Sequence, residues 1–539
     1  MTTLYRGGFV YTPIDPFANA MVVDDATGTI AWIGGDDAAS THAGSVEEVV
    51  ELEGALVTPA FVDAHAHISQ TGAAMRGVDL SSASSRDEVL TRIESAARSG
   101  GGRPIHAPNW DEGGWPDSRP PTAYELDRAS FGGVVYSPRV DRHSAVISSA
   151  LAAASSAAAL PGWRGDGLVT REAHHAARDT FNAAVTPSQR RDDIDLALRA
   201  AAAAGIGLVQ ECGGPVLSST DDFADVLAAG ARGDRPQTLG YWAELAEDEQ
   251  QAHDLATLHA AHGLAGDLNI DGSIGSRTAH LRAPYADSPD DVGNAYLTVE
   301  QVRDHVAGCS LAGIQAGFHV IGDAGVDTAI AGFEAAAALV GADRVRRARH
   351  RLEHAEMIDG DGVRRLVTLG VTASVQPAFD ALWGGGAGMY AVRLGRARAA
   401  RMNPFATMLA EGMTVALGSD SPVTPFAPWE SVRACVNHHE SAQRVSARSA
   451  FLAHTRGAWR AAGIDDRGYL DLGLPATFAV WRVGDLVVQA PDDRIQAWST
   501  DPRSGTPGLP DLSPGAPAPV ALRTVVRGRT VFDAGSLGS

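Results

Sequence analysis

Two histidines separated by a single residue are the first feature of this sequence that could carry out chemistry. His65 and His67 follow the apolar run 60–63 in Ala-Phe-Val-Asp-Ala-His-Ala-His. Side chains two positions apart on a strand point to the same face, so two imidazoles at the end of this predicted strand could bind one divalent metal ion. Taken alone, the pair is equally compatible with two histidines of purely structural role.

Three further side chains strengthen the metal hypothesis through their spacing. His319, His354 and Asp420 each end a strand-like run, and the intervals of 35 and 66 residues between them correspond to one and two strand–helix units. All five side chains therefore fall at the C-terminal ends of predicted strands, where parallel barrels place their active sites. Neutral imidazoles with a carboxylate suit Zn²⁺, and also Fe²⁺ or Mn²⁺.

The elements that must position these residues alternate between strands and helices. This alternation predicts an α/β fold, a (β/α)₈ TIM-like barrel. Helical patterns at 188–204, 299–312 and 324–340 separate several of the strands. The predicted strands are 61–67, 206–213, 238–245, 268–272, 314–321, 351–354, 372–376 and 414–420.

The two ends of the chain differ from its middle. Both are rich in short strand-like runs, which predicts a small composite β-sandwich domain formed by residues 1–57 together with 475–539. The barrel is expected over residues 58–474. The gap between its first two strands is far longer than one connection, so we expect an insertion at about 70–185 on the catalytic face.

Longer motifs support a family resemblance. The run Thr58–His67 resembles the first-strand signature of the amidohydrolase superfamily. Further motifs are similar to those of its family 3 branch, which includes N-substituted formamide deformylase. These motifs are Asn109-Trp-Asp-Glu with Trp115-Pro, Val140-Asp-Arg-His-Ser, Asp271-Gly-Ser-Ile-Gly-Ser-Arg-Thr-Ala, His319-Val-Ile-Gly-Asp-Ala and Gly418-Ser-Asp-Ser-Pro-Val.

The resemblance implies a metal-dependent hydrolase with a barrel and a small β-domain. It implies that His65, His67, His319 and His354 are metal ligands, and that Asp420 is both a ligand and the general base. His354 would hold either the metal or the carbonyl oxygen of the substrate.

The sequence departs from the family pattern at one position. Many superfamily members bridge two metals with a carboxylated lysine, but this chain contains no lysine and has Asp267 at that position. Three alternatives remain open: a single metal, a bridge from another carboxylate, or Asp267 in the bridging role after a backbone shift. Glu211 and Glu172 are the other candidate carboxylates. We expect one tightly bound divalent ion, with zinc the leading candidate, and room for a second.

Chemically, such a site predicts hydrolysis of a non-peptide C–N (amide-type) bond in a small molecule by metal-activated water. Asp420 would accept the proton of the water and deliver it to the leaving nitrogen. The same ligands would serve a deaminase or a cyclic amide or lactone hydrolase, and a catalytically inactive barrel scaffold is a third alternative.

Four residues are weaker candidates for substrate binding. Arg277 could clamp a substrate carboxylate, although a structural salt bridge explains it equally well. Trp110, Trp115 and His143 lie in the predicted insertion and could line the pocket.

The overall composition limits the choice of partners. The chain carries 44 Lys and Arg residues against 65 Asp and Glu, a net charge of −21. This balance argues against a nucleic-acid or membrane partner and favours a small-molecule substrate. Three widely spaced cysteines and no leader-like N-terminus lead us to expect a cytoplasmic protein. A homodimer is one open option for its assembly.

Overall fold

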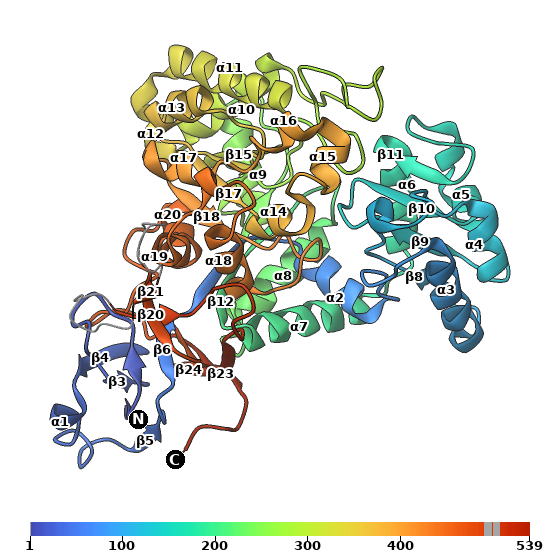
Figure 1. The fold of residues 1–539 in the computed structure, drawn as a ribbon. Coiled ribbons are helices and arrows are strands. Elements are labelled where there is room, and N and C mark those ends of the chain that lie inside the picture. Colours follow the sequence, from blue (N-terminus) through green and yellow to red (C-terminus); the bar gives the residue numbers. More distant parts are fainter. Residues whose placement is uncertain (1, 490–497, 500–506, 539) are drawn as a thin grey trace.

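Eight parallel strands form the central sheet of the protein (Figure 1). The computed structural model describes residues 2–489, 498–499 and 507–538, so parts of the predicted segment 475–539 lie outside the described residues. The sheet closes where Ala66, at the end of its first strand, bridges Ser421 beyond its last strand. The predicted α/β barrel is therefore confirmed. Its strands are β7 (Phe61–Ala66), β12 (Ile206–Gly213), β13 (Gln237–Trp242), β14 (Gly263–Leu264), β15 (Gln315–Val320), β16 (Arg351–His354), β17 (Thr372–Val375) and β18 (Val415–Leu417).

The fourth strand is the one barrel element that the sequence misplaced. It lies at 263–264, whereas the apolar alternation had predicted it at 268–272. Gly266 adopts φ 85° directly after β14 and ends the strand. The later segment still runs beside β15, because Asn269 forms a parallel bridge with His319. Its strand-like sequence therefore reflects a real neighbour at the mouth of the barrel.

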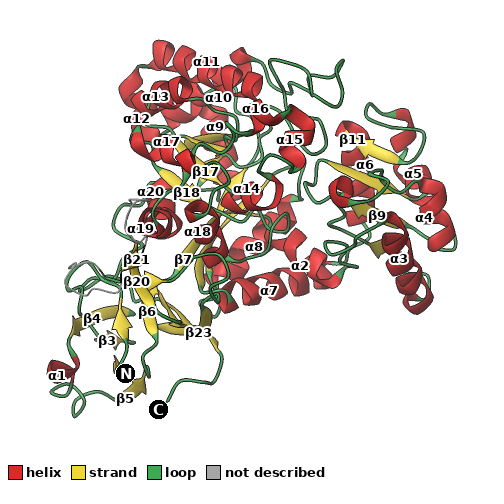
Figure 2. Ribbon diagram, in the orientation of Figure 1, coloured by secondary structure: helices red, strands yellow, loops and turns green. Residues whose placement is uncertain are grey.

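Helices pack around the outside of this sheet (Figure 2). Helix α7 begins with a capping box formed by Thr186 and Gln189, and α10 begins with one formed by Thr298 and Gln301. The outer helices are α2 (Ile68–Arg76), α7 (Pro187–Ala203), α8 (Thr220–Ala231), α9 (Glu249–His259), α10 (Val299–Ala312), α11 (Asp323–Val340), α12 (Ala342–Ala348), α13 (Gly360–Thr368), α17 (Phe405–Ala410), α18 (Pro428–Val436), α19 (Ala447–Leu452) and α20 (Ala458–Ala461). Three shorter helices follow β17: α14 (Pro377–Trp383), α15 (Met389–Leu394) and α16 (Arg396–Ala399).

The long connection between β7 and β12 contains a sheet of its own. Figure 1 shows this insertion standing beside the barrel, on the right of the view. Its four strands lie in the order β11-β10-β9-β8 and form two separate apolar cores with the neighbouring helices. Its elements are α3 (Arg86–Gly100), β8 (Ile105–His106), α4 (Ala123–Ala129), β9 (Val135–Pro138), β10 (Ser144–Ile147), α5 (Ser149–Ser155), β11 (Leu168–Thr170) and α6 (Arg171–Asn182).

Strands from both ends of the chain form the small β-domain at the lower left of Figure 1. One sheet has the order β4-β3-β1-β5, and a second, β2-β6-β19-β23-β24, joins strands from the two ends. The C-terminal part adds a third sheet, β21-β20-β22. The composite β-domain is thus confirmed, while its boundaries at 57 and 474 stay predictions. The elements are β1 (Thr2–Arg6), β2 (Phe9–Val10), β3 (Ala20–Asp24), β4 (Thr29–Gly34), α1 (Asp36–Ala39), β5 (Glu48–Glu51), β6 (Leu56–Pro59), β19 (Phe478–Arg482), β20 (Leu486–Gln489), β21 (Trp498–Ser499), β22 (Leu509–Pro510), β23 (Val520–Val526) and β24 (Arg529–Asp533).

An aromatic cluster joins the β-domain to the barrel. Phe61, at the start of β7, is fully buried, and its ring centroid lies 5.0 Å from Trp429, 5.4 Å from Phe451 and 5.7 Å from Trp481. These edge-to-face contacts are favourable arrangements for aromatic rings. Because β7 also carries the His65–His67 pair, this packing fixes the strand that positions both histidines.

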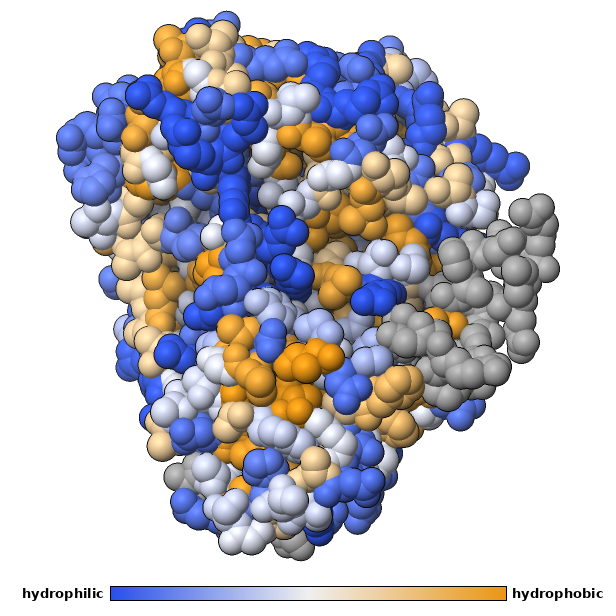
Figure 3. Space-filling view, turned by 90° about the vertical axis from the view of Figure 1, so that its left-hand side faces the viewer, coloured by the Kyte–Doolittle hydropathy of each residue, from blue (hydrophilic) through white to orange (hydrophobic). Residues whose placement is uncertain are grey.

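The outer surface is mixed in character. On the face that Figure 3 presents, apolar residues form small groups interrupted by hydrophilic ones. Within the described residues, no single helix is long and apolar enough to cross a membrane, although α11 and α12, bent by 119°, would pass such a test as a pair.

We expect Phe61→Ala to reduce the free energy of unfolding by about 3–5 kcal/mol, since the truncation leaves a cavity among three aromatic rings. Urea denaturation followed by fluorescence would measure the change. Phe9→Ala is the matched control, because Phe9 is 51% exposed and its loss should change stability by less than about 0.5 kcal/mol. Equal midpoints for the two variants would contradict this role of Phe61.

Candidate metal centre

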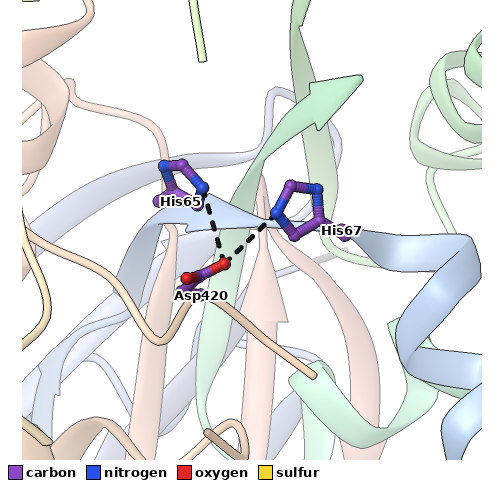
Figure 4. A group of neighbouring side chains, drawn as sticks. All are labelled: His65, His67 and Asp420. Carbon is purple, nitrogen blue, oxygen red and sulfur yellow. Dashed lines mark ion pairs between the residues drawn. The ribbon is translucent and has the colours of Figure 1, made fainter. Parts of the chain in front are cut away.

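Imidazole and carboxylate groups from distant parts of the chain meet at the C-terminal end of the barrel. Figure 4 shows His65 and His67 at the end of β7 directed toward the same carboxylate oxygen of Asp420, which follows β18. Asp420 Oδ1 lies 3.5 Å from His65 Nε2 and 3.2 Å from His67 Nε2. These three groups are close enough to share one metal ion.

Asp267 lies at the centre of the wider cluster. Its carboxylate oxygens lie 3.4 Å from His65 Nε2 and 3.2 Å from His67 Nε2. They also lie 3.4 Å from His319 Nδ1 and 3.7 Å from His354 Nε2. One carboxylate therefore faces all four imidazoles, and a second candidate group consists of His65, Asp267 and His354.

The backbone before Asp267 explains how so short a side chain reaches the centre. Gly266 adopts φ 85° and passes close to β12, where an added Cβ would lie 3.0 Å from the Cβ of Cys212. This close approach carries the chain inward beside the barrel mouth. The Asp267 carboxylate thus faces the four imidazoles, while its role as a bridge between two metals stays a prediction.

Each imidazole is oriented by a partner on its outer nitrogen. His65 Nδ1 donates to Glu353 Oε2 at 2.9 Å, because a carboxylate can only accept. His67 Nδ1 donates to a backbone carbonyl at 2.8 Å, and His354 Nδ1 donates to the side-chain oxygen of Gln376 at 2.7 Å. His319 faces the opposite way, with Nε2 directed 3.3 Å from a backbone carbonyl. In every case the other nitrogen faces the cluster, where it could offer its lone pair to a cation, as metal-ligating histidines require.

A buried charge pair inside the barrel supports this arrangement. Arg351 donates to both oxygens of Glu353, at 2.5 and 2.9 Å, and to Gln210 Oε1 at 2.7 Å. Burial raises the pKa of Glu353, but Arg351 and the hydrogen bond from His65 outweigh it and lower the pKa to about 2. Glu353 is therefore ionised at neutral pH and holds the His65 ring in one orientation.

The negative charge of the carboxylates in the cluster is not balanced, and several buried atoms lack a hydrogen-bond partner within the described part of the chain. Among the described residues, five buried atoms that face one another have no hydrogen-bond partner: His65 Nε2, Asp267 Oδ1, His319 Nδ1, His354 Nε2 and Asp420 Oδ1. Burial lowers the pKa of His67, but the adjacent carboxylates of Asp267 and Asp420 raise it well above the usual range. The carboxylates would thus draw protons onto the imidazoles in the absence of a cation. A divalent cation would neutralise the same carboxylates, so these residues fit a metal ion.

Unusual backbone conformations occur at two of the five residues. His354 has φ 69° and Asp420 has φ 54°. Such left-handed conformations cost a non-glycine residue roughly 1–3 kcal/mol and occur preferentially at functional sites. They interrupt the alternation of side chains at the ends of β16 and β18.

A small cavity of about 30 Å³ adjoins the cluster. Helices α14 and α15 form one wall of it, and the insertion approaches from another side. Arg393 of α15 donates to Glu112 at 2.8 Å and to Asp287 at 2.7 Å, which ties this wall to the insertion and to the loop after β14. The apolar lining consists of Ile274, Ile321, Phe379, Trp383, Met389 and Val423.

The other candidate carboxylates do not join the metal cluster. Glu211 is buried, and its Oε2 accepts a hydrogen bond from the backbone N–H of Ile68 at 2.7 Å. Burial raises the pKa of Glu211 to about 7. Glu172 has a half-exposed side chain beside Arg171. Among the described residues, neither belongs to a group of side chains that could hold a metal ion.

The candidate substrate-binding residues are distributed differently. His143 lines the cavity, with its ring centroid 5.0 Å from that of His319, and burial with the nearby His319 lowers its pKa to about 4. Arg277 is paired with Asp287 at 2.7 Å. Trp110 and Trp115 are buried in the core of the insertion, and their indole nitrogens donate to backbone carbonyls. The structure therefore brings only His143 to the cavity.

Several residues that shape the site were not found from the sequence. Glu353 and Gln376 orient imidazoles, and Glu356 and Tyr390 line the cavity. The position of Glu353 directly before His354 was a usable signal. Gln376 carried none, because it ends a neighbouring strand and meets His354 only in the folded barrel.

The barrel, the cluster at its mouth and the comparisons define this protein as a metal-dependent hydrolase. The chain belongs to the amidohydrolase family, since the model of that family matches residues 48–532. The resemblance drawn from the sequence motifs is thereby confirmed.

Individual relatives are moderately similar over most of their length. The chain is 28% identical to LONG AFTER FAR-RED 3 of Arabidopsis thaliana over 513 residues, which covers 88% of this chain and 86% of the plant protein. It is 25% identical to N-substituted formamide deformylase of Arthrobacter pascens, covering 84% and 88%. A crystal structure of an uncharacterized metal-dependent hydrolase from Pyrococcus horikoshii shares the fold, with a TM-score of 0.70, 24% identity and coverage of 89% and 97%.

Replacing both first-strand histidines, His65→Asn with His67→Asn, should abolish tight metal binding, because it removes two ligands from one ion. Elemental analysis of the dialysed protein would measure this. A matched control is His42→Asn with His253→Asn, which lie far from the cluster in the sequence. Retention of a stoichiometric metal by the His65/His67 variant would contradict the assignment.

We expect Gln376→Leu to weaken metal binding about 10- to 100-fold, because His354 would lose the acceptor that orients its ring. Competition with a chelator would measure the affinity. Gln250→Leu, an exposed change on α9, serves as the control. Equal affinities for the two variants would show that Gln376 does not support metal binding through His354.

Proposed function

We propose that this protein hydrolyses a non-peptide, amide-type C–N bond of a small molecule, with a divalent metal, zinc first, held by His65, His67, His319, His354 and Asp420. The observation that carries the proposal is the convergence of unpartnered ring nitrogens and carboxylate oxygens at the barrel mouth. We propose one tightly held ion, with Asp267 placed to bridge toward a second.

The chemistry that a bound divalent ion supplies here is Lewis acidity, which acidifies water and polarises a carbonyl group. The chain itself supplies the proton transfer. Asp420 lies beside the His65–His67 pair and at the edge of the cavity, where it can accept the proton of the attacking water and pass it to the leaving nitrogen. His354 also faces the cavity, so a substrate carbonyl could be positioned between these two residues.

The similarity to N-substituted formamide deformylase supports an amide substrate over the alternatives. Deamination and the hydrolysis of cyclic amides or lactones use the same kind of centre, and the walls of the pocket select among them. An inactive scaffold is disfavoured because all five side chains are present and face one another. A panel of N-acyl and N-formyl amines, cyclic amides and esters, tested with the metal-reconstituted protein, would distinguish these functions.

Asp420→Asn should reduce kcat about 10²- to 10⁴-fold, because the amide cannot accept the proton of water. The fold should persist, and metal should largely remain through the four histidines. Steady-state kinetics with the best substrate of the panel and elemental analysis would measure both effects. Asp343→Asn, on the surface of α12, is the control. Turnover at the parental rate in Asp420→Asn would show that another group is the base.

A further inference from the structure

Two buried polar side chains lie beside each other in the cavity wall, with oxygen atoms that make no hydrogen bond of good geometry within the described residues. Glu356 follows β16 and is 3% exposed, and Tyr390 lies on α15 and is 2% exposed. Both line the cavity beside the metal cluster. Among the described residues, neither Glu356 Oε2 nor the hydroxyl of Tyr390 has a hydrogen-bond partner.

Such groups are costly unless something binds to them. A buried polar atom left without a partner destabilises a protein by about 1–3 kcal/mol, and native structures contain few of them. The wall that carries Tyr390 is held in place, because Arg393 three residues later bonds to Glu112, Asp287 and the carbonyl of Gly275. The two groups are therefore held beside each other at the cavity, and both keep hydrogen-bonding capacity for a ligand.

The surroundings of this pair are apolar. The same cavity is lined by six apolar side chains, Ile274, Ile321, Phe379, Trp383, Met389 and Val423. A ligand reaching from the metal centre into this wall would pass apolar side chains and then meet two oxygen atoms. Pockets of this kind use a few polar groups to fix the orientation of an otherwise apolar ligand.

We propose that Glu356 and Tyr390 form a specificity subsite for a hydrogen-bond donor of the substrate. This inference rests on the proposed function and narrows it to amides whose apolar portion ends in an N–H or O–H group. The carboxyl oxygen of Glu356 accepts from that group, and the Tyr390 hydroxyl makes the second contact. Both are specificity-determining residues that act on the far end of the substrate, apart from the bond that breaks.

A matched pair of small amides tests the subsite. N-formyl-4-aminobutan-1-ol ends in a hydroxyl, and N-formylpentylamine has a methyl group at the same place. Calorimetry with the metal-loaded full chain would give the two Kd values, and product analysis of the same mixtures would report hydrolysis separately. We expect the hydroxyl compound to bind about tenfold more tightly, since a polar site rejects an analogue that leaves it unpaired.

Two conservative variants locate the effect. Tyr390→Phe and Glu356→Gln should each lower the binding preference for the hydroxyl compound about two- to tenfold, whereas the exposed control Tyr124→Phe should leave the preference unchanged. Equal binding of both compounds to the parent protein, or binding of neither at millimolar concentration, would overturn the subsite. A preference in binding without hydrolysis would support the subsite and count against the proposed amide hydrolysis.

Discussion

The rest of this structure depends on one constraint: two largely buried carboxylates face four imidazoles and must have their charge balanced. Burial raises the pKa of Asp267 and of Asp420, but the neighbouring imidazoles outweigh it and lower both. These carboxylates face ring nitrogens at 3.2–3.7 Å, and among the described residues neither forms an ion pair with an arginine. Burying such charges without compensation is expensive. A divalent cation resolves the conflict, and the outer hydrogen bonds of the histidines keep their lone pairs directed toward it. The arrangement would therefore destabilise a purely structural core, whereas a bound metal ion would stabilise it.

The barrel supplies the precision that this cluster requires. Its closure between Ala66 and Ser421 brings the first and last strands together, which places the two histidines of β7 beside Asp420. Beneath them, Arg351 and Glu353 form a rigid charged layer that fixes His65. The insertion and the helices after β17 then enclose the cavity. The same barrel supports many chemistries, so these walls, more than the metal, determine the substrate.

The sequence predicted the repeated architecture and the five side chains because both follow periodic rules. Strand–helix alternation and the position of polar residues at strand ends are local signals. The sequence could not show that Asp267 faces all four imidazoles. That position depends on how Gly266 packs against Cys212, a contact between segments distant in the sequence. Three other residues are of types suited to substrate binding, but the structure uses them elsewhere. Arg277 is paired with Asp287, and Trp110 and Trp115 pack in the core of the insertion. Partners of this kind become visible only in three dimensions.

The central claim is that one cation is bound by imidazole nitrogens from β7 and by Asp420. Crystals of the metal-loaded protein measured on both sides of the zinc absorption edge would test it most directly. The account predicts an anomalous peak within about 2.0–2.2 Å of Nε2 of His65 and of His67. A structure with no peak there, or with these two nitrogens directed away from a common point, would contradict it.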